Sequence, residues 1–213
     1  MQSQAVEHLT MSEAEQTPPP SSFDVDDALI RRGFPPKFMR RDWTLARTIS
    51  RYSPPAARDE NGAFRGFKGL FLTGATGTKK TASLCLLARD WLREVGARGR
   101  LSWRFVSFPE LCLRLQEAWG SGSEMTPSEI IQELSTVPFL ILDEIGAEKT
   151  TEFVLQSAYT ILNKREWAEL PVYGTSNLSI EEIGAKMDPR IASRIRGMCE
   201  VLPVGGHDQR AHP

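Results

Sequence analysis

The chain has 213 residues, of which 40% are hydrophobic, and its formal net charge is −1. That length and apolar content suit one ordinary domain with a sizeable core. The sequence has no apolar run of the roughly 18 residues that a membrane span needs, and its acidic start lacks the basic and apolar regions of a signal peptide. We therefore expect a cytoplasmic protein without a membrane partner.

Charge is unevenly spread along the chain. Six of the 27 acidic residues and none of the 26 basic residues lie within residues 1–30, so the remainder is mildly basic, with 26 basic and 21 acidic residues. Such a body permits a nucleic-acid partner. Cys85, Cys112 and Cys199 are far apart, in apolar surroundings and without C-x-x-C spacing, which predicts reduced core residues.

The first 60 residues divide into two parts. Residues 1–22 are polar, end in Pro-Pro-Pro-Ser-Ser and are predicted to be a disordered tail. Residues 23–60 form a lead-in segment, with a short helix from Phe23 to Ile30 that the Gly-Phe-Pro-Pro sequence at 33–36 ends. Basic and aromatic residues at 37–43 suit packing of Phe38 and Trp43 on the domain better than contact with nucleic acid or an adenine ring. The core domain is predicted over 61–213.

A short apolar strand up to Thr73 leads into a glycine-containing loop. The pattern G-x-x-x-x-G-K-[ST] is met at Gly74, Lys80 and Thr81, but Lys79 stands where the pattern has its second glycine. Glycines let such a loop aim backbone N–H groups at a triphosphate, and the following helix turns its positive N-terminal end to the anion. The sequence predicts a phosphate site made of Gly74, Ala75, Thr76, Gly77, Thr78, Lys79, Lys80, Thr81 and Ala82. Lys80 would reach the β- and γ-phosphates, and the Thr81 hydroxyl would bind Mg²⁺.

The next elements follow from apolar spacing and capping residues. Apolar residues at 84, 87, 88, 91, 92 and 95 predict a helix that ends at Gly96. A strand is expected over 102–107 and a helix from Pro109 to Trp119. The capping signal Thr126-Pro127-Ser128-Glu129 opens a further helix to about Leu134.

A second chemical element follows at 137–144, where an apolar strand ends in Asp143 and Glu144. In the same domain as a phosphate loop, this pair predicts that Asp143 holds Mg²⁺ and that Glu144 polarises an attacking water. A helix at 151–167 precedes a strand at 171–177, whose end places Asn177 at the ligand crevice as a sensor of the γ-phosphate, a turn-forming Asn being the alternative.

The last predicted helix begins at Asp188-Pro189 and carries two arginines on one face. Asp188 caps it, Pro189 lies in its first turn, and Arg190 and Arg194 are four residues apart. A terminal strand is expected over 199–204.

Four segments carry a family resemblance: Phe-Val-Ser-Phe-Pro-Glu-Leu at 105–111, Leu-Ile-Leu-Asp-Glu-Ile-Gly-Ala at 140–147, Thr-Ser-Asn-Leu at 175–178 and Arg-Ile-Ala-Ser-Arg at 190–194. Their order and spacing are those of the DnaC/IstB family, and residues 34–210 resemble an AAA+ ATPase of that group, related to DnaA. The resemblance implies an α/β fold, an αβα sandwich with a central parallel sheet and no separate C-terminal lid domain. Residues 61–213 would be its P-loop ATPase core.

The resemblance also implies cofactors, partners and roles. ATP and Mg²⁺ are the expected cofactors, and members load a replicative helicase onto DNA, expected to be single-stranded, or assist a transposase. Asp143 and Glu144 match the Walker B pair, and Asn177 matches sensor 1. Arg194 matches the arginine that completes a neighbouring subunit's site in a homo-oligomer, with Arg190 as the alternative, and Arg210 is a weak match to sensor 2.

Lys79 leaves ATP turnover open. It is expected to impair ATP binding, and Lys79→Gly to restore it. The alternative function is a nucleotide-binding-impaired AAA+ fold that acts only as a protein or DNA interaction module. A metabolic P-loop kinase is disfavoured, because no arginine-rich lid segment follows the P-loop helix.

Overall fold

The computed structural model describes residues 25–39, 68–95, 103–119 and 124–206. The predicted tail at 1–22, together with Trp43, Gly96 and Arg210, lies outside the described residues. The elements, in chain order, are α1 (Val25–Ile30), α2 (Pro36–Met39), β1 (Gly69–Thr73), α3 (Lys80–Val95), β2 (Trp103–Ser107), α4 (Phe108–Glu117), α5 (Pro127–Thr136), β3 (Phe139–Asp143), α6 (Glu152–Trp167), β4 (Val172–Ser176), α7 (Ile180–Lys186), α8 (Pro189–Met198) and β5 (Cys199–Pro203).

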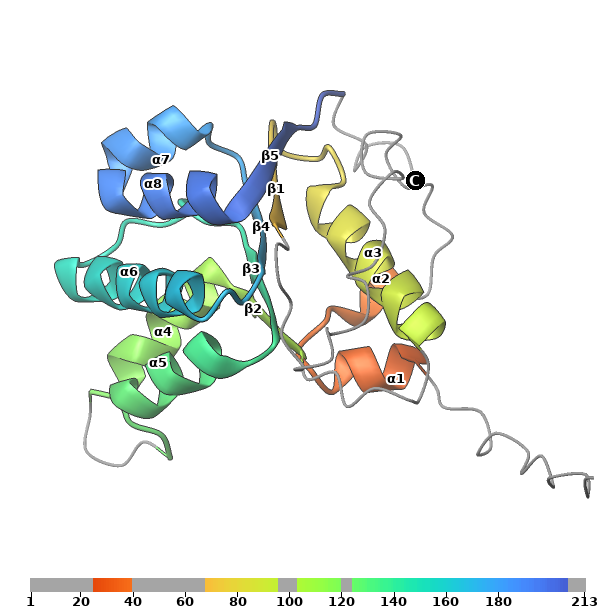
Figure 1. Ribbon diagram of the computed structural model, residues 1–213, viewed down its shortest axis with the longest axis horizontal. Helices are drawn as coiled ribbons and strands as arrows, with labels where there is room; N and C mark the ends of the chain where they lie inside the picture. Colours follow the sequence, from red (N-terminus) through yellow and green to blue (C-terminus); the bar gives the residue numbers. More distant parts are fainter. Residues whose placement is uncertain (1–24, 40–67, 96–102, 120–123, 207–213) are drawn as a thin grey trace, which may run out of the picture.

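The five strands form one parallel sheet in the order β2-β3-β4-β1-β5. Helices cover both faces, α4 to α8 on one side and α1 to α3 on the other (Figure 1). Every residue of β1, β3 and β4 is buried, as expected for parallel strands between two helical layers. The predicted αβα sandwich with a central parallel sheet is confirmed.

Each face of the sheet has its own apolar core. Leu140, Leu142 and Ile161 belong to the core under α4 to α8, whereas Leu72 and Leu84 belong to the core under α1 and α3. The three cysteines are buried and free, as the sequence predicts. None of the described helices is both long and apolar enough to cross a membrane.

The lead-in segment packs on the α3 side of the sheet. Phe34 is fully buried against the rings of Trp103 and Phe105, with centroids 6.4 and 5.2 Å away. The Phe105 N–H donates to the Arg32 carbonyl at 3.0 Å, and Phe38 packs against the same core. Of the predicted aromatic pair, Phe38 therefore packs on the domain as expected.

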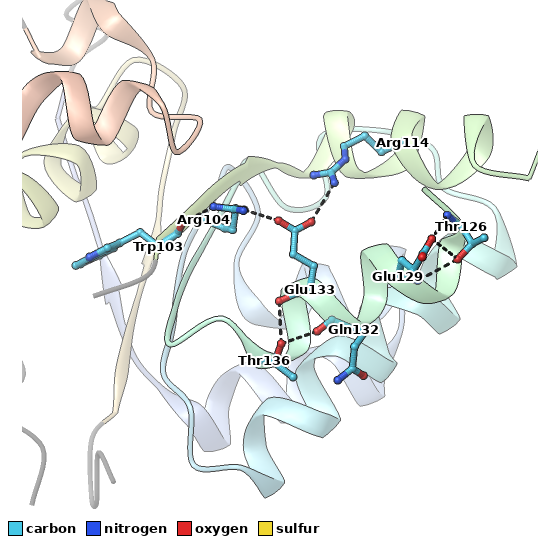
Figure 2. A network of polar contacts seen from close by, with 8 residues as sticks. All are labelled: Trp103, Arg104, Arg114, Thr126, Glu129, Gln132, Glu133 and Thr136. Carbon is cyan, nitrogen blue, oxygen red and sulfur yellow. Dashed lines mark hydrogen bonds and ion pairs between the residues drawn. The ribbon is translucent and has the colours of Figure 1, made fainter. Parts of the chain in front are cut away.

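One carboxylate of helix α5, that of Glu133, joins this helix to β2 and α4. Glu133 accepts hydrogen bonds from Arg104 of β2 and Arg114 of α4 (Figure 2). Burial raises the pKa of Glu133, but the hydrogen bonds and charges of the two arginines lower it by more, so the net shift is downward. The predicted capping box is also present, because the Thr126 N–H donates to the Glu129 carboxylate at 2.7 Å and the Glu129 N–H to Thr126 Oγ1 at 3.3 Å.

Arg165 of α6 is completely buried beneath the sheet's amino-terminal edge. Its guanidinium donates to four backbone carbonyls at 2.6 to 3.2 Å, those of Leu134, Val137, Pro138 and Pro171. These carbonyls belong to the end of α5 and to the segments that enter β3 and β4. Burial lowers the pKa of Arg165 to about 9, so the group is still charged at neutral pH.

Two short helices, α2 and α7, are absent from the predicted elements. Helix α7 has a complete capping box, in which the Ser179 N–H donates to the Glu182 carboxylate at 2.8 Å and the Glu182 N–H to Ser179 Oγ at 3.2 Å. This S-x-x-E spacing is a readable signal. Helix α2 has four residues and begins at Pro36, inside the sequence that the prediction treats only as a break.

Candidate functional site

The phosphate-type loop joins the carboxyl end of β1 to the start of α3. Gly74 has φ +141°, and a Cβ there would lie 2.2 Å from the Val204 carbonyl oxygen, so no side chain fits. Gly77 has φ +81°, in the region that favours glycine. The geometry at Gly74 explains the first glycine of the motif, whereas Gly77 stands at a position that the motif leaves open.

Lys79 has φ +64°, which places a non-glycine residue in the left-handed region. That conformation costs an L-residue about 1–2 kcal/mol. The segments on both sides of Lys79 hold this conformation. The Lys79 carbonyl accepts the Ser83 N–H at 2.9 Å in the first turn of α3, and the glycine-bearing loop precedes Lys79. The backbone thus keeps the conformation that suits the motif's missing glycine, at the expense of fold stability.

Lys80 connects the loop to the end of β4. Its Nζ donates to the carbonyls of Gly74 and Ala75 at 2.7 and 2.8 Å and to Asn177 Oδ1 at 2.9 Å. The residue is 6% exposed, whereas Asn177 is exposed. The predicted phosphate lysine and the predicted sensor therefore lie side by side.

Asp143 lies at the carboxyl end of β3, beside the start of α3. Thr81 Oγ1 lies 2.9 and 3.0 Å from its two carboxylate oxygens, and Thr175 Oγ1 donates to Oδ1 at 2.6 Å. Burial raises the pKa of Asp143, and the hydrogen bonds from Thr175 and Thr81 oppose that rise. Its two partners are neutral hydroxyls, so a divalent cation fits this buried carboxylate and its neighbouring Thr81 hydroxyl.

Glu144 follows in a second left-handed conformation, with φ +59°. Its N–H donates to Thr175 Oγ1 at 3.0 Å, and the next N–H, that of Ile145, donates to the Thr175 carbonyl at 2.9 Å. Thr175 is absent from the predicted site. A usable signal was its place two residues before Asn177, because alternate residues of a strand share a face.

The two candidate arginines lie on the helical layer formed by α6 and α8. Arg194 is paired with Glu166, and its guanidinium lies 5.8 Å from the centre of the Tyr159 ring. Arg190 binds Asp188, its own helix cap, at 2.7 Å and lies 4.7 Å from the same ring. The structure thus gathers the loop, Asp143, Glu144 and Asn177 at one edge of the sheet, while both arginines contact α6 or the start of α8.

No protein-family model matches the chain. The chain is 33% identical over 159 residues to the replicative helicase loader DnaI of Bacillus subtilis (strain 168), which is 68% of this chain and 48% of the relative. The chain thus spans about half the length of that curated relative.

Two solved structures share the fold. A DnaI crystal structure has a TM-score of 0.61 at 24% identity, covering 83% of this chain and 94% of that one. The DnaC helicase loader has a TM-score of 0.54 at 18% identity, covering 74% and 96%. With the parallel sheet, these likenesses show that the chain has the AAA+ P-loop fold of these structures, and over the matched residues its sequence is similar to that of a replicative helicase loader.

Proposed function

We propose that this chain is an AAA+ protein of the helicase-loader type, which binds Mg-ATP at the edge formed by β1, β3 and β4. The observation that carries the proposal is the meeting of three motifs from three strands. Lys80 contacts Asn177 at 2.9 Å, and Thr81 contacts Asp143 at 2.9 Å. A phosphate-binding lysine, a buried carboxylate and a polar sensor are the groups that phosphoryl transfer needs in one place.

Each residue of the site has a separate proposed role. The N–H groups at the start of α3 and the Lys80 ammonium would hold the phosphates, because both present positive charge at the loop. Thr81 and Asp143 would hold Mg²⁺, which when bound neutralises the charge that develops on the phosphates. Glu144 would orient and accept a proton from water, and Asn177 would fix the γ-phosphate end.

The partner proposal rests on the relatives. The curated relative is named a replicative helicase loader, and DnaC is named a helicase loader. We therefore infer a replicative helicase as partner in preference to a transposase. The mildly basic body suits weak, salt-sensitive contact with single-stranded DNA. Arg194 remains the proposed trans-acting arginine of a homo-oligomer.

One observation favours a second candidate function, an interaction module with impaired nucleotide binding. Lys79 brings a Cβ, a four-carbon stem and a charge to a position where the motif has none. If that side chain occupies the phosphate path, the fold would serve only to bind other macromolecules.

Titration with Mg-ATP by calorimetry separates the two candidates, with Lys80→Ala as the matched variant. Binding by the natural chain that Lys80→Ala abolishes supports the nucleotide function. Binding absent from both the natural chain and Lys79→Gly excludes it. A pull-down of the replicative helicase from the same organism, with and without ATP, then tests the loader assignment.

A further inference from the structure

We infer that Thr175 is a positioning residue, whose single hydroxyl holds the metal carboxylate Asp143 and the water-activating Glu144 in fixed relation. The inference rests on the proposed nucleotide function for its consequence, but its geometry stands by itself. Thr175 lies at the fourth position of β4 and is 1% exposed.

The hydroxyl uses both of its hydrogen-bonding capacities. It donates its proton to Asp143 Oδ1 at 2.6 Å and accepts the Glu144 N–H at 3.0 Å. A hydroxyl has one donor and two acceptor sites, so these two bonds are compatible. Asp143 and Glu144 are consecutive residues. The two bonds therefore connect the end of β3 directly to the Thr175 side chain of the neighbouring strand β4.

The link acts on two different groups. On Asp143 it occupies one lone pair of Oδ1, which leaves the carboxylate turned toward Thr81. On Glu144 it satisfies the N–H of a residue held at φ +59°, a conformation that needs support from its surroundings. The Thr175 carbonyl adds to this support by accepting the Ile145 N–H at 2.9 Å.

Two variants separate the hydroxyl from the shape of the side chain. Thr175→Val keeps the shape and removes the hydroxyl, whereas Thr175→Ser keeps the hydroxyl. Ser157→Ala is the matched control, because Ser157 is also a buried hydroxyl, 2% exposed, and it donates to the Phe153 carbonyl of its own helix.

The first measurement uses the chain without nucleotide. Amide hydrogen exchange followed by NMR should show the Glu144 N–H exchanging about tenfold faster or more in Thr175→Val, and near its natural rate in Thr175→Ser and Ser157→Ala. Unchanged exchange in Thr175→Val overturns the inference, whatever the chain does with ATP. Should the valine variant fail to fold, Thr175→Ala removes the same hydroxyl and is measured in its place.

The second measurement is the affinity for ATP with Mg²⁺ and with EDTA. Loss of a group that orients a metal ligand typically weakens metal affinity about 10- to 100-fold. Thr175→Val should therefore lose Mg-ATP affinity by about that factor and keep metal-free ATP affinity. Equal loss in both conditions indicates general distortion and overturns the positioning role. If the natural chain binds ATP in neither condition, the proposed function fails, and the amide exchange alone decides the role of Thr175.

Discussion

Lys79→Gly should make the folded chain more stable. The φ of +64° at Lys79 carries a strain of about 1–2 kcal/mol, which a glycine at this position would remove. Against this, glycine gives the unfolded chain extra freedom worth about 0.4–1 kcal/mol. The net gain expected is about 0.5–1 kcal/mol, or a rise in Tm of about 1–4 °C for a chain of this size. Urea unfolding followed by circular dichroism measures it.

The same variant should also bind Mg-ATP more tightly. The strain is imposed by the fold, so it weighs on folding and not on the binding step. The gain in affinity must then come from removing the side chain from the phosphate path, and we expect about tenfold or more, measured by calorimetry.

Lys79→Ala is the matched control for both effects. It keeps the Cβ and the left-handed strain, but removes the stem and the charge, so it should gain affinity without gaining stability. Equal stability of the glycine and alanine variants would refute the strain. Micromolar affinity in the natural chain, with none gained in Lys79→Gly, would refute the steric account of this loop.

Three further outcomes are expected. Arg194→Ala should lower ATP turnover of the assembled protein by about 10³-fold and leave the monomer's nucleotide affinity unchanged, whereas equal loss of both would remove its trans role. Glu133→Gln should cost about 1 kcal/mol at pH 7 in urea unfolding. Because the folded pKa of Glu133 lies below the ordinary 4.5, its contribution is present above pH 4.5 and disappears as pH falls through the folded pKa, so a constant difference down to pH 3 would contradict the pairing. Arg165→Met should destabilise the chain by about 3–5 kcal/mol, since it takes the guanidinium donor from four backbone carbonyls, and a loss below about 1 kcal/mol would show that they find other partners.

Long elements with strong signals could be predicted from sequence. The strand before Asp143 is continuously apolar because helices cover it on both faces, and the Thr126 capping box fixes the start of α5. Helix α7 was missed despite an equal signal at Ser179 and Glu182. It has seven residues, too few for apolar periodicity to show.

The chemistry of each single motif could be predicted from the sequence, but the contacts between motifs could not. The residues of the phosphate loop, Asp143 and Asn177 follow from local patterns, whereas their meeting depends on the strand order β3-β4-β1. The role of Thr175 depends on its hydroxyl lying between Asp143, the last residue of β3, and Glu144, which follows it. The cis partners of Arg194 likewise depend on how α8 packs on α6.

The buried guanidinium of Arg165 has a mechanical consequence for this sheet. It fastens the entrances of β3 and β4 to each other through the carbonyls of Val137, Pro138 and Pro171. Any sliding of one strand along the other would break several of these bonds, two of which are buried. We therefore expect the two strands to move together. If the chain binds nucleotide as proposed, the accompanying motion is expected at the opposite edge of the sheet, in the loops around Gly74 and Glu144.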